Sequence, residues 1–198
     1  MTIPRLLTAM ITPYDDKLQV DYARAAELAD YLANNGSEGI VVSGTTGESP
    51  VLTDEEKLKL FAAVKGKLGK RIPVWAGTGS NDTQHSLELS KEAEKLGVDG
   101  VMLVCPYYSK PSQEGLYQHF RKIAGAISLP VMLYNVPGRT GINLLPETVT
   151  RLAKIENIVA IKEASGSMDQ VSTLMTLLPE EMTVYSGDDS LTLPMMAL

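Results

Sequence analysis

Short apolar runs alternate with longer amphipathic segments along most of this 198-residue chain. Short runs between turn residues are typical of buried strands, whereas the longer segments repeat their apolar residues with the period of a helix. The expected strands are Leu6–Ile11, Gly39–Val42, Val74–Ala76, Val101–Val104, Val131–Tyr134, Val159–Ile161 and Thr183–Tyr185. The expected helices are Tyr22–Asn34, Asp54–Leu68, Thr83–Leu96, Gln113–Ile127, Pro146–Lys154 and Met168–Leu178.

Local signals mark several ends of these expected helices. Thr53 and Glu56 have the spacing of a capping box, in which each side chain satisfies an amide at the start of a helix. Gly36 and Gly97 follow expected helices, where a left-handed backbone favours glycine.

Alternation of strand and helix at a spacing of roughly 30 residues implies parallel strands joined by helical crossovers. A doubly wound open sheet and a closed barrel both satisfy this pattern. The near-equal spacing, and the lack of a dinucleotide fingerprint after the first strand, favour an α/β fold of the (β/α)8 TIM barrel type. We therefore predict a single (β/α) barrel domain over residues 1–198.

Seven strands are expected, and the sequence ends around Pro194 in what resembles the first turn of another helix. A complete barrel has eight strands and about 250 residues. The expected domain therefore lacks the eighth strand and the C-terminal helical region. We interpret the sequence as a truncated copy, or a part, of a longer protein.

The composition excludes several classes of protein. A net charge of −6 and a pI near 5.0 argue against a nucleic-acid binder, which needs concentrated Lys and Arg. No apolar stretch approaches the roughly 18 residues that cross a bilayer, so we expect no membrane association and a cytoplasmic location. The one cysteine, Cys105, lies in an apolar run and is expected to be buried. His85 and His119 lack the spacing of metal ligands, so we expect surface positions for both, and no metal or cofactor.

Lys162 ends an expected strand that is apolar on both faces. Because side chains alternate along a strand, Lys162 shares a face with Ala160, and Glu163 lies on the opposite face. If the lysine face points into the barrel, burial lowers the pKa and favours the neutral amine that attacks a ketone. The alternative is a structural lysine that pairs with an acid, for which Glu163 is poorly placed.

Other polar residues end or follow expected strands, and in a barrel such positions gather on one face. A phenol such as Tyr134 can donate and accept protons beside an imine, although most tyrosines at strand ends only pack. Arg139 presents a fork suited to a carboxylate, although an isolated arginine is usually solvated. The turn with Thr45 and Thr46 can present amides to a small anion or can be a simple tight turn.

Five segments taken together resemble the dihydrodipicolinate synthase family, also called the 4-hydroxy-tetrahydrodipicolinate synthase family. The segments are Gly44–Glu48, Pro106–Gly115, Tyr134–Gly141, Ile161–Gly166 and Ser186–Asp189. The resemblance implies a barrel-shaped lyase that condenses pyruvate with L-aspartate 4-semialdehyde in lysine and diaminopimelate biosynthesis. It also implies a homo-oligomer, either a dimer or a homotetramer built from two tight dimers.

The resemblance further implies a role for each matching residue. Lys162 would form a Schiff base with pyruvate, and Tyr134 would transfer protons. Thr45 would link Tyr134 to Tyr108, which in this family reaches into the site of the neighbouring subunit.

Three further positions are implied to bind substrate. The backbone around Thr46 would hold the carboxylate of pyruvate, and Arg139 would hold the carboxylate of the incoming aldehyde. Gly187 would line the substrate site.

One departure from the family concerns regulation. In lysine-inhibited relatives an acidic residue on the third helix holds the ammonium of the inhibitor, whereas this chain has His85 there. Asp54 and Lys57 replace nearby histidines. Because a lysine or a protonated histidine repels an ammonium, we predict weak lysine feedback.

Two alternatives to the synthase remain. Another Schiff-base pyruvate aldolase, such as N-acetylneuraminate lyase or a keto-deoxy sugar acid aldolase, would share Lys162 and Tyr134. Arg139 and Tyr108 favour the synthase, because a sugar acid has no carboxylate at the position of the semialdehyde. A non-catalytic remnant is the second alternative, suggested by the short length.

Overall fold

Seven strands make up one sheet in the computed structural model, which describes residues 3–198. The strands are β1 (Leu7–Ala9), β2 (Gly39–Val42), β3 (Val74–Gly77), β4 (Gly100–Val104), β5 (Val131–Asn135), β6 (Ile158–Glu163) and β7 (Thr183–Ser186). Their order in the sheet is their order in the chain, and the pairs β1–β2, β2–β3, β3–β4, β5–β6 and β6–β7 are parallel. A doubly wound sheet reverses its order at a switch point. The sequential order therefore confirms the predicted α/β class, with seven strands in the topology of a (β/α) barrel.

Helices follow the strands in regular alternation. The α-helices are α1 (Tyr22–Asn34), α2 (Asp54–Leu68), α3 (Thr83–Lys95), α4 (Gln113–Ala124), α5 (Pro137–Thr140), α6 (Pro146–Leu152), α7 (Met168–Leu177) and α8 (Thr192–Met196). Two short 3-10 helices are η1 (Ser49–Val51) and η2 (Asp189–Leu191). Within residues 3–198, none of these helices combines the length and the apolar character needed to cross a membrane.

The predicted capping signals act as expected at the helix ends. The Thr53 hydroxyl accepts a hydrogen bond from the Glu56 amide at 3.3 Å, and the Glu56 carboxylate accepts one from the Thr53 amide at 2.8 Å. Gly36 and Gly97 have φ values of 100° and 74°, in the left-handed region that favours glycine. The capping box and both left-handed caps are therefore confirmed.

Several element boundaries differ from the predictions. The first strand is 3 residues long, shorter than the predicted Leu6–Ile11. Helix α4 ends at Ala124 and not at Ile127, and carbonyl groups at and beyond this end accept hydrogen bonds from the Asn157 side chain. Its Nδ2 donates to the carbonyl oxygens of Ala124, Ile127 and Leu129 at 2.9, 3.2 and 3.1 Å.

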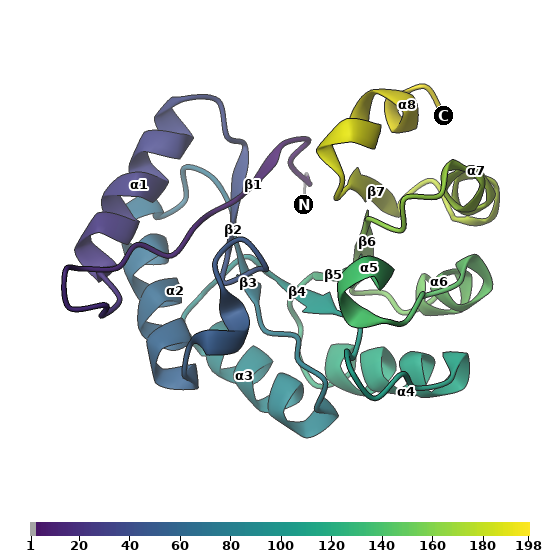
Figure 1. Cartoon of the computed structure of the whole chain (residues 1–198), viewed down its shortest axis with the longest axis horizontal. Coiled ribbons are helices and arrows are strands. Elements are labelled where there is room, and N and C mark those ends of the chain that lie inside the picture. Colours follow the sequence, from purple (N-terminus) through teal and green to yellow (C-terminus); the bar gives the residue numbers. More distant parts are fainter. Residues whose placement is uncertain (1–2) are drawn as a thin grey trace. The chain divides into compact units, whose positions relative to one another are not determined.

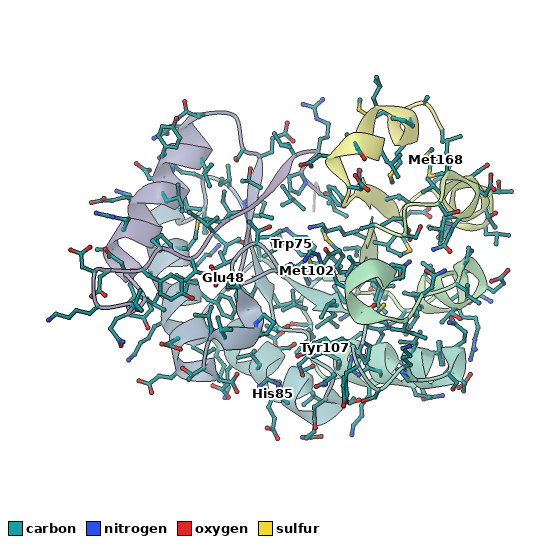
Figure 2. All side chains as sticks on the ribbon, in the orientation of Figure 1. Glu48, Trp75, His85, Met102, Tyr107 and Met168 are labelled. Atoms are coloured by element: carbon teal, nitrogen blue, oxygen red, sulfur yellow. The ribbon has the colours of Figure 1, made fainter. Side chains whose placement is uncertain are left out.

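The chain divides into two compact units. The first contains residues up to 78 and residues 89–102, and the second contains residues 79–88 and 103–198. In the first unit α1 and α2 pack side by side next to β1, β2 and β3 (Figure 1), and the labelled Trp75 and Met102 are buried (Figure 2). In the second unit α4, α6 and α7 follow one another beside β5, β6 and β7 (Figure 1), and Cys105 is fully buried, as predicted.

The predicted surface position of His119 is wrong. The residue follows the buried Leu116 by three positions on α4, so it falls on the inner stripe of that helix. Its Nδ1 lies 2.8 Å from the Thr83 hydroxyl, and burial lowers its pKa to about 4. His85 is half-buried, with its Nδ1 3.0 Å from the Ser80 hydroxyl.

Candidate active site

Lys162 on β6 and Tyr134 on β5 stand opposite each other in the ladder that joins these strands. Residues in register on neighbouring strands project their side chains to the same face of the sheet. The Lys162 Nζ lies 4.6 Å from the centroid of the Tyr134 ring, and Tyr134 is buried. The structure thus brings the predicted amine and phenol together.

The surroundings of Lys162 favour its neutral form. The side chain is half-buried, and burial lowers the pKa of the ammonium from its ordinary value, while the negative charge of Asp189 partly offsets this effect. An amine must lose its proton before it can attack a ketone, and a lowered pKa makes that loss easier.

Glu163 points to the face opposite Lys162, as predicted from strand alternation. Its carboxylate is buried and accepts hydrogen bonds from the Asn135 side chain at 3.1 Å, the Ser165 amide at 2.6 Å and the Gln170 side chain at 3.3 Å. The sequence reasoning missed these partners. A polar residue in an apolar strand was the available signal for Asn135, whereas nothing distinguishes Gln170 from any other polar residue on a helix.

Gly187 lies directly beside the lysine. It follows β7, its amide donates to the Glu163 carbonyl at 2.8 Å, and an added β-carbon would lie 3.0 Å from both Cγ and Cε of Lys162. The small residue at this position leaves room for the lysine side chain, a steric role that the sequence pattern did not indicate.

Tyr108 and Arg139 lie on two loops of the second unit that are joined to each other. The Tyr108 amide donates to the Thr140 carbonyl at 3.3 Å, which ties the loop after β4 to α5, the short helix that carries Arg139. Pro137 begins this helix, and its ring suits a first helical turn. Arg139 is exposed, and Tyr108 is 89% exposed with a φ of 72°, so its side chain projects away from its own unit.

Thr45 and Thr46 belong to the first unit, in the turn that follows β2. Both are exposed, and their amides donate to no acceptor among residues 3–198. The turn closes with the Gly47 amide donating to the Gly44 carbonyl at 3.1 Å, and the Thr12 hydroxyl donates to the Gly47 carbonyl at 2.6 Å. This arrangement leaves two adjacent amides available to an anion.

Five of the seven predicted site residues therefore belong to the second unit and two to the first. Those of the second unit are Tyr108, Tyr134, Arg139, Lys162 and Gly187, and those of the first are Thr45 and Thr46. In the part of the chain that the structure describes, no group of three or more His, Cys, Asp or Glu side chains is placed to hold a metal ion.

Known proteins with similar sequences agree in family. The model of the dihydrodipicolinate synthetase family matches residues 2–198. The 4-hydroxy-tetrahydrodipicolinate synthase of Heliobacterium modesticaldum is 60% identical over 198 residues, which is 100% of this chain and 66% of that protein. The chain thus spans slightly less than two thirds of the length of this curated relative.

Solved structures show the same likeness. The dihydrodipicolinate synthase DapA-2 of Bacillus anthracis matches with a TM-score of 0.97 and 53% identity, covering 100% of this chain and 68% of that one. The dihydrodipicolinate synthase of Acinetobacter baumannii, solved in complex with pyruvate, matches with a TM-score of 0.95 and 45% identity, covering 98% and 67% of the two chains. On the sequence match, the strand order and these structural likenesses, the chain belongs to the dihydrodipicolinate synthetase family.

Proposed function

We propose that this chain carries the active-site lysine of a 4-hydroxy-tetrahydrodipicolinate synthase, a lyase of lysine and diaminopimelate biosynthesis. The substrates would be pyruvate and L-aspartate 4-semialdehyde. The observation that carries the proposal is the half-buried Lys162 amine, with its lowered pKa, against the ring of Tyr134. The names of the relatives support the reaction, and the pyruvate complex of the Acinetobacter baumannii protein supports the first substrate.

In the proposed reaction the neutral Lys162 amine attacks the ketone carbon of pyruvate, and loss of water leaves a protonated imine. The cationic nitrogen withdraws electrons, so the methyl group of pyruvate can lose a proton and form an enamine. The enamine carbon then forms the new bond to the aldehyde carbon of the second substrate. Tyr134 is the proposed donor and acceptor of the protons, because its ring centroid lies 4.6 Å from the Lys162 Nζ and a phenol can do both.

The remaining predicted residues would bind and orient the substrates. The amides of Thr45 and Thr46 would hold the pyruvate carboxylate, and the exposed guanidinium of Arg139 would hold the carboxylate of the semialdehyde. Gly187 would line the pyruvate site next to Lys162. These roles rest on the family resemblance together with the exposure of each group.

We also propose that the working enzyme is a cytoplasmic homo-oligomer, either a dimer or a tetramer. Tyr108 would extend from one subunit to the site of its neighbour and complete a proton relay with Thr45 and Tyr134. The support for this is that Tyr108 is 89% exposed, on a backbone with a φ of 72°. The Tyr108 ring is therefore accessible to another subunit, and its left-handed backbone is uncommon for a residue other than glycine.

Borohydride trapping with pyruvate tests the proposal directly. The purified chain is incubated with pyruvate and sodium borohydride, and its peptides are analysed by mass spectrometry. We expect one reduced pyruvyl adduct on Lys162, and none in Lys162→Arg. Absence of an adduct on Lys162 in folded protein would favour a non-catalytic remnant.

A coupled assay of the trapping-competent protein then separates the synthase from its relatives. We expect turnover of pyruvate with L-aspartate 4-semialdehyde and no cleavage of N-acetylneuraminate. Cleavage of N-acetylneuraminate would instead identify a sugar-acid aldolase.

A further inference from the structure

A network of buried polar side chains lies on the face of β5 and β6 that is opposite Lys162 and Tyr134. Asn135 directly follows Tyr134, and Glu163 directly follows Lys162, so each points away from its neighbour. Asn135 is 0% exposed and Glu163 is 1% exposed. Burial of an amide and a carboxylate is costly unless both are well hydrogen-bonded, so their presence in these strands calls for an explanation.

Asn135 uses all the hydrogen-bonding groups of its side-chain amide. Its Nδ2 donates to the Glu163 carboxylate at 3.1 Å and to the Asn143 side-chain oxygen at 2.8 Å. Its Oδ1 accepts from the Leu144 amide at 2.9 Å. These contacts hold the side chain in one orientation and link β5 both to β6 and to the segment that leads into α6.

Glu163 extends the same network to α7 and to the turn after β6. The Gln170 Nε2 donates to one carboxylate oxygen at 3.3 Å, and the Ser165 amide donates to the other at 2.6 Å. Gln170 also accepts from the Asn143 side chain at 2.8 Å, which closes a ring of hydrogen bonds with Asn135. A closed ring of this kind resists movement of any single member more than separate hydrogen bonds would.

The ring of hydrogen bonds lies at the rungs where the register of β5 and β6 must be maintained. The register shifts between Val131 and Met132, so the pairing at the far end of β5 does not follow simply from its start. The final rungs pair Tyr134 with Lys162 and Asn135 with Glu163. A slip of one residue would turn every later side chain of the strand to the other face.

We propose that Asn135 and Glu163 are positioning residues, whose buried hydrogen bond holds the last rungs of β5 and β6 in register and so keeps Lys162 against Tyr134. Neither group touches the reacting atoms, because both lie on the opposite face. The catalytic consequence rests on the function proposed above. A displacement of about 1 Å at a reacting group can cost about 100-fold in rate. Hydrogen bonds on one face of the sheet can therefore affect the reaction rate at Lys162 on the other face.

Exchange of the two partners tests the proposal. Asn135→Asp places two carboxylates against each other, and Glu163→Gln places two amides in contact. The double variant N135D/E163Q restores one carboxylate and one amide with the positions exchanged. Glu156→Gln, at an exposed residue before β6, is the control for loss of a carboxylate.

The main readout is the rate of borohydride trapping of pyruvate on Lys162 across a range of pH. We expect each single variant to lower the maximal trapping rate about 10- to 100-fold. We also expect each to move the pH at half-maximal rate, because the contact between Lys162 and Tyr134 is altered. The double variant should recover most of the rate and the original midpoint, and Glu156→Gln should match the parent. A change confined to the melting temperature, with both rate and midpoint within about twofold of the parent, would overturn the proposal.

The pKa of Lys162, measured by NMR on 15N-lysine-labelled protein, separates this proposal from the proposed function. It needs no pyruvate, so it reports on position even if the parent traps nothing. We expect the Lys162 resonance to titrate at an altered pH in each single variant and at the parental pH in the double variant. An unchanged titration in the single variants refutes the positioning role, whatever the trapping result.

If the single variants do not fold, Gln170→Leu decides the question. It removes one donor to Glu163 from a half-buried helix position and leaves Asn135 in place. We expect a smaller change in the same direction for both the trapping rate and the Lys162 titration. Parental values for both measurements in folded Gln170→Leu would overturn the proposal.

Discussion

A β-carbon at position 187 would lie 3.0 Å from both Cγ and Cε of Lys162. Real β-carbon contacts are rarely so short, so a larger residue at position 187 would force the Lys162 side chain to shift by a few tenths of an ångström. The same β-carbon would lie 3.0 Å from the β-carbon of Ala164, so moving it toward Ala164 would not relieve the contact with Lys162. The absence of a side chain at Gly187 therefore helps to determine the position of the Lys162 amine.

Gly187→Ala should displace the Lys162 side chain. We expect trapping of pyruvate to fall at least about 10-fold, because a nucleophile moved by a fraction of an ångström loses much of its advantage. Gly66→Ala, on the exposed side of α2 where an added β-carbon meets nothing within 4 Å, should leave trapping unchanged. Trapping at the parental rate in Gly187→Ala would contradict the prediction, because it would show that the Lys162 side chain accommodates the added methyl group without loss of reactivity.

The pH dependence of imine formation should follow the charge near Lys162. Asp189 raises the pKa of Lys162 against the larger lowering by burial. Removing this charge in Asp189→Asn should lower the pKa further, so that more of the amine is neutral at a given pH. The midpoint of trapping against pH should therefore move to lower pH, while Asp16→Asn, at an exposed residue of the first unit, should not move it.

Stability at mildly acidic pH should depend on His119. Its folded-state pKa is lowered to about 4 from an ordinary value of 6.5. A group with a lowered pKa binds its proton more readily when unfolded, so its contribution to stability is complete above pH 6.5 and is lost progressively towards pH 4. The loss can reach about 3 kcal/mol.

Replacement of the histidine by an uncharged residue checks this contribution. His119→Asn keeps a polar group near the Thr83 hydroxyl but cannot gain the charge. Urea unfolding at several pH values should show a flatter dependence in the variant between pH 6.5 and 4. Equal slopes for parent and variant would contradict the prediction.

Gly77 permits a close approach of two backbone segments in the first unit. A β-carbon there would overlap the carbonyl group of Ser43, which is backbone and cannot move aside like a flexible side chain. Gly77→Ala should destabilise the protein by at least about 2 kcal/mol. Gly66→Ala should stabilise it by about 0.5–1 kcal/mol, because alanine favours a helix interior. Thermal unfolding of the two variants measures both changes, and equal melting temperatures would count against the steric argument.

Feedback by L-lysine should be weak. The half-buried His85 occupies the position predicted for the acidic group of lysine-inhibited relatives, and Lys57 is buried in α2. Neither attracts an ammonium as a carboxylate does. In protein that shows the condensation activity proposed above, sub-millimolar L-lysine should leave that activity unaffected, and His85→Glu should increase sensitivity. Strong inhibition of the parent by sub-millimolar L-lysine would refute the prediction.

Much of the fold was predictable from sequence because it depends on residues near one another in the chain. The alternation of apolar runs and amphipathic segments determined the α/β class, and the capping box at Thr53 determined where α2 begins. Strand alternation also determined that Lys162 and Glu163 face opposite ways. Each of these properties arises from backbone geometry over a few residues.

The tertiary structure alone decided features that depend on residues far apart in the chain. The carbonyl at the end of α4 is hydrogen-bonded by Asn157, 33 residues beyond Ala124. The ring of hydrogen bonds that joins Asn135 to Glu163, 28 residues away, has no counterpart in any local pattern. A local pattern specifies which way a side chain points, but the partner that it meets depends on how distant segments pack, and that information is absent from short windows of sequence.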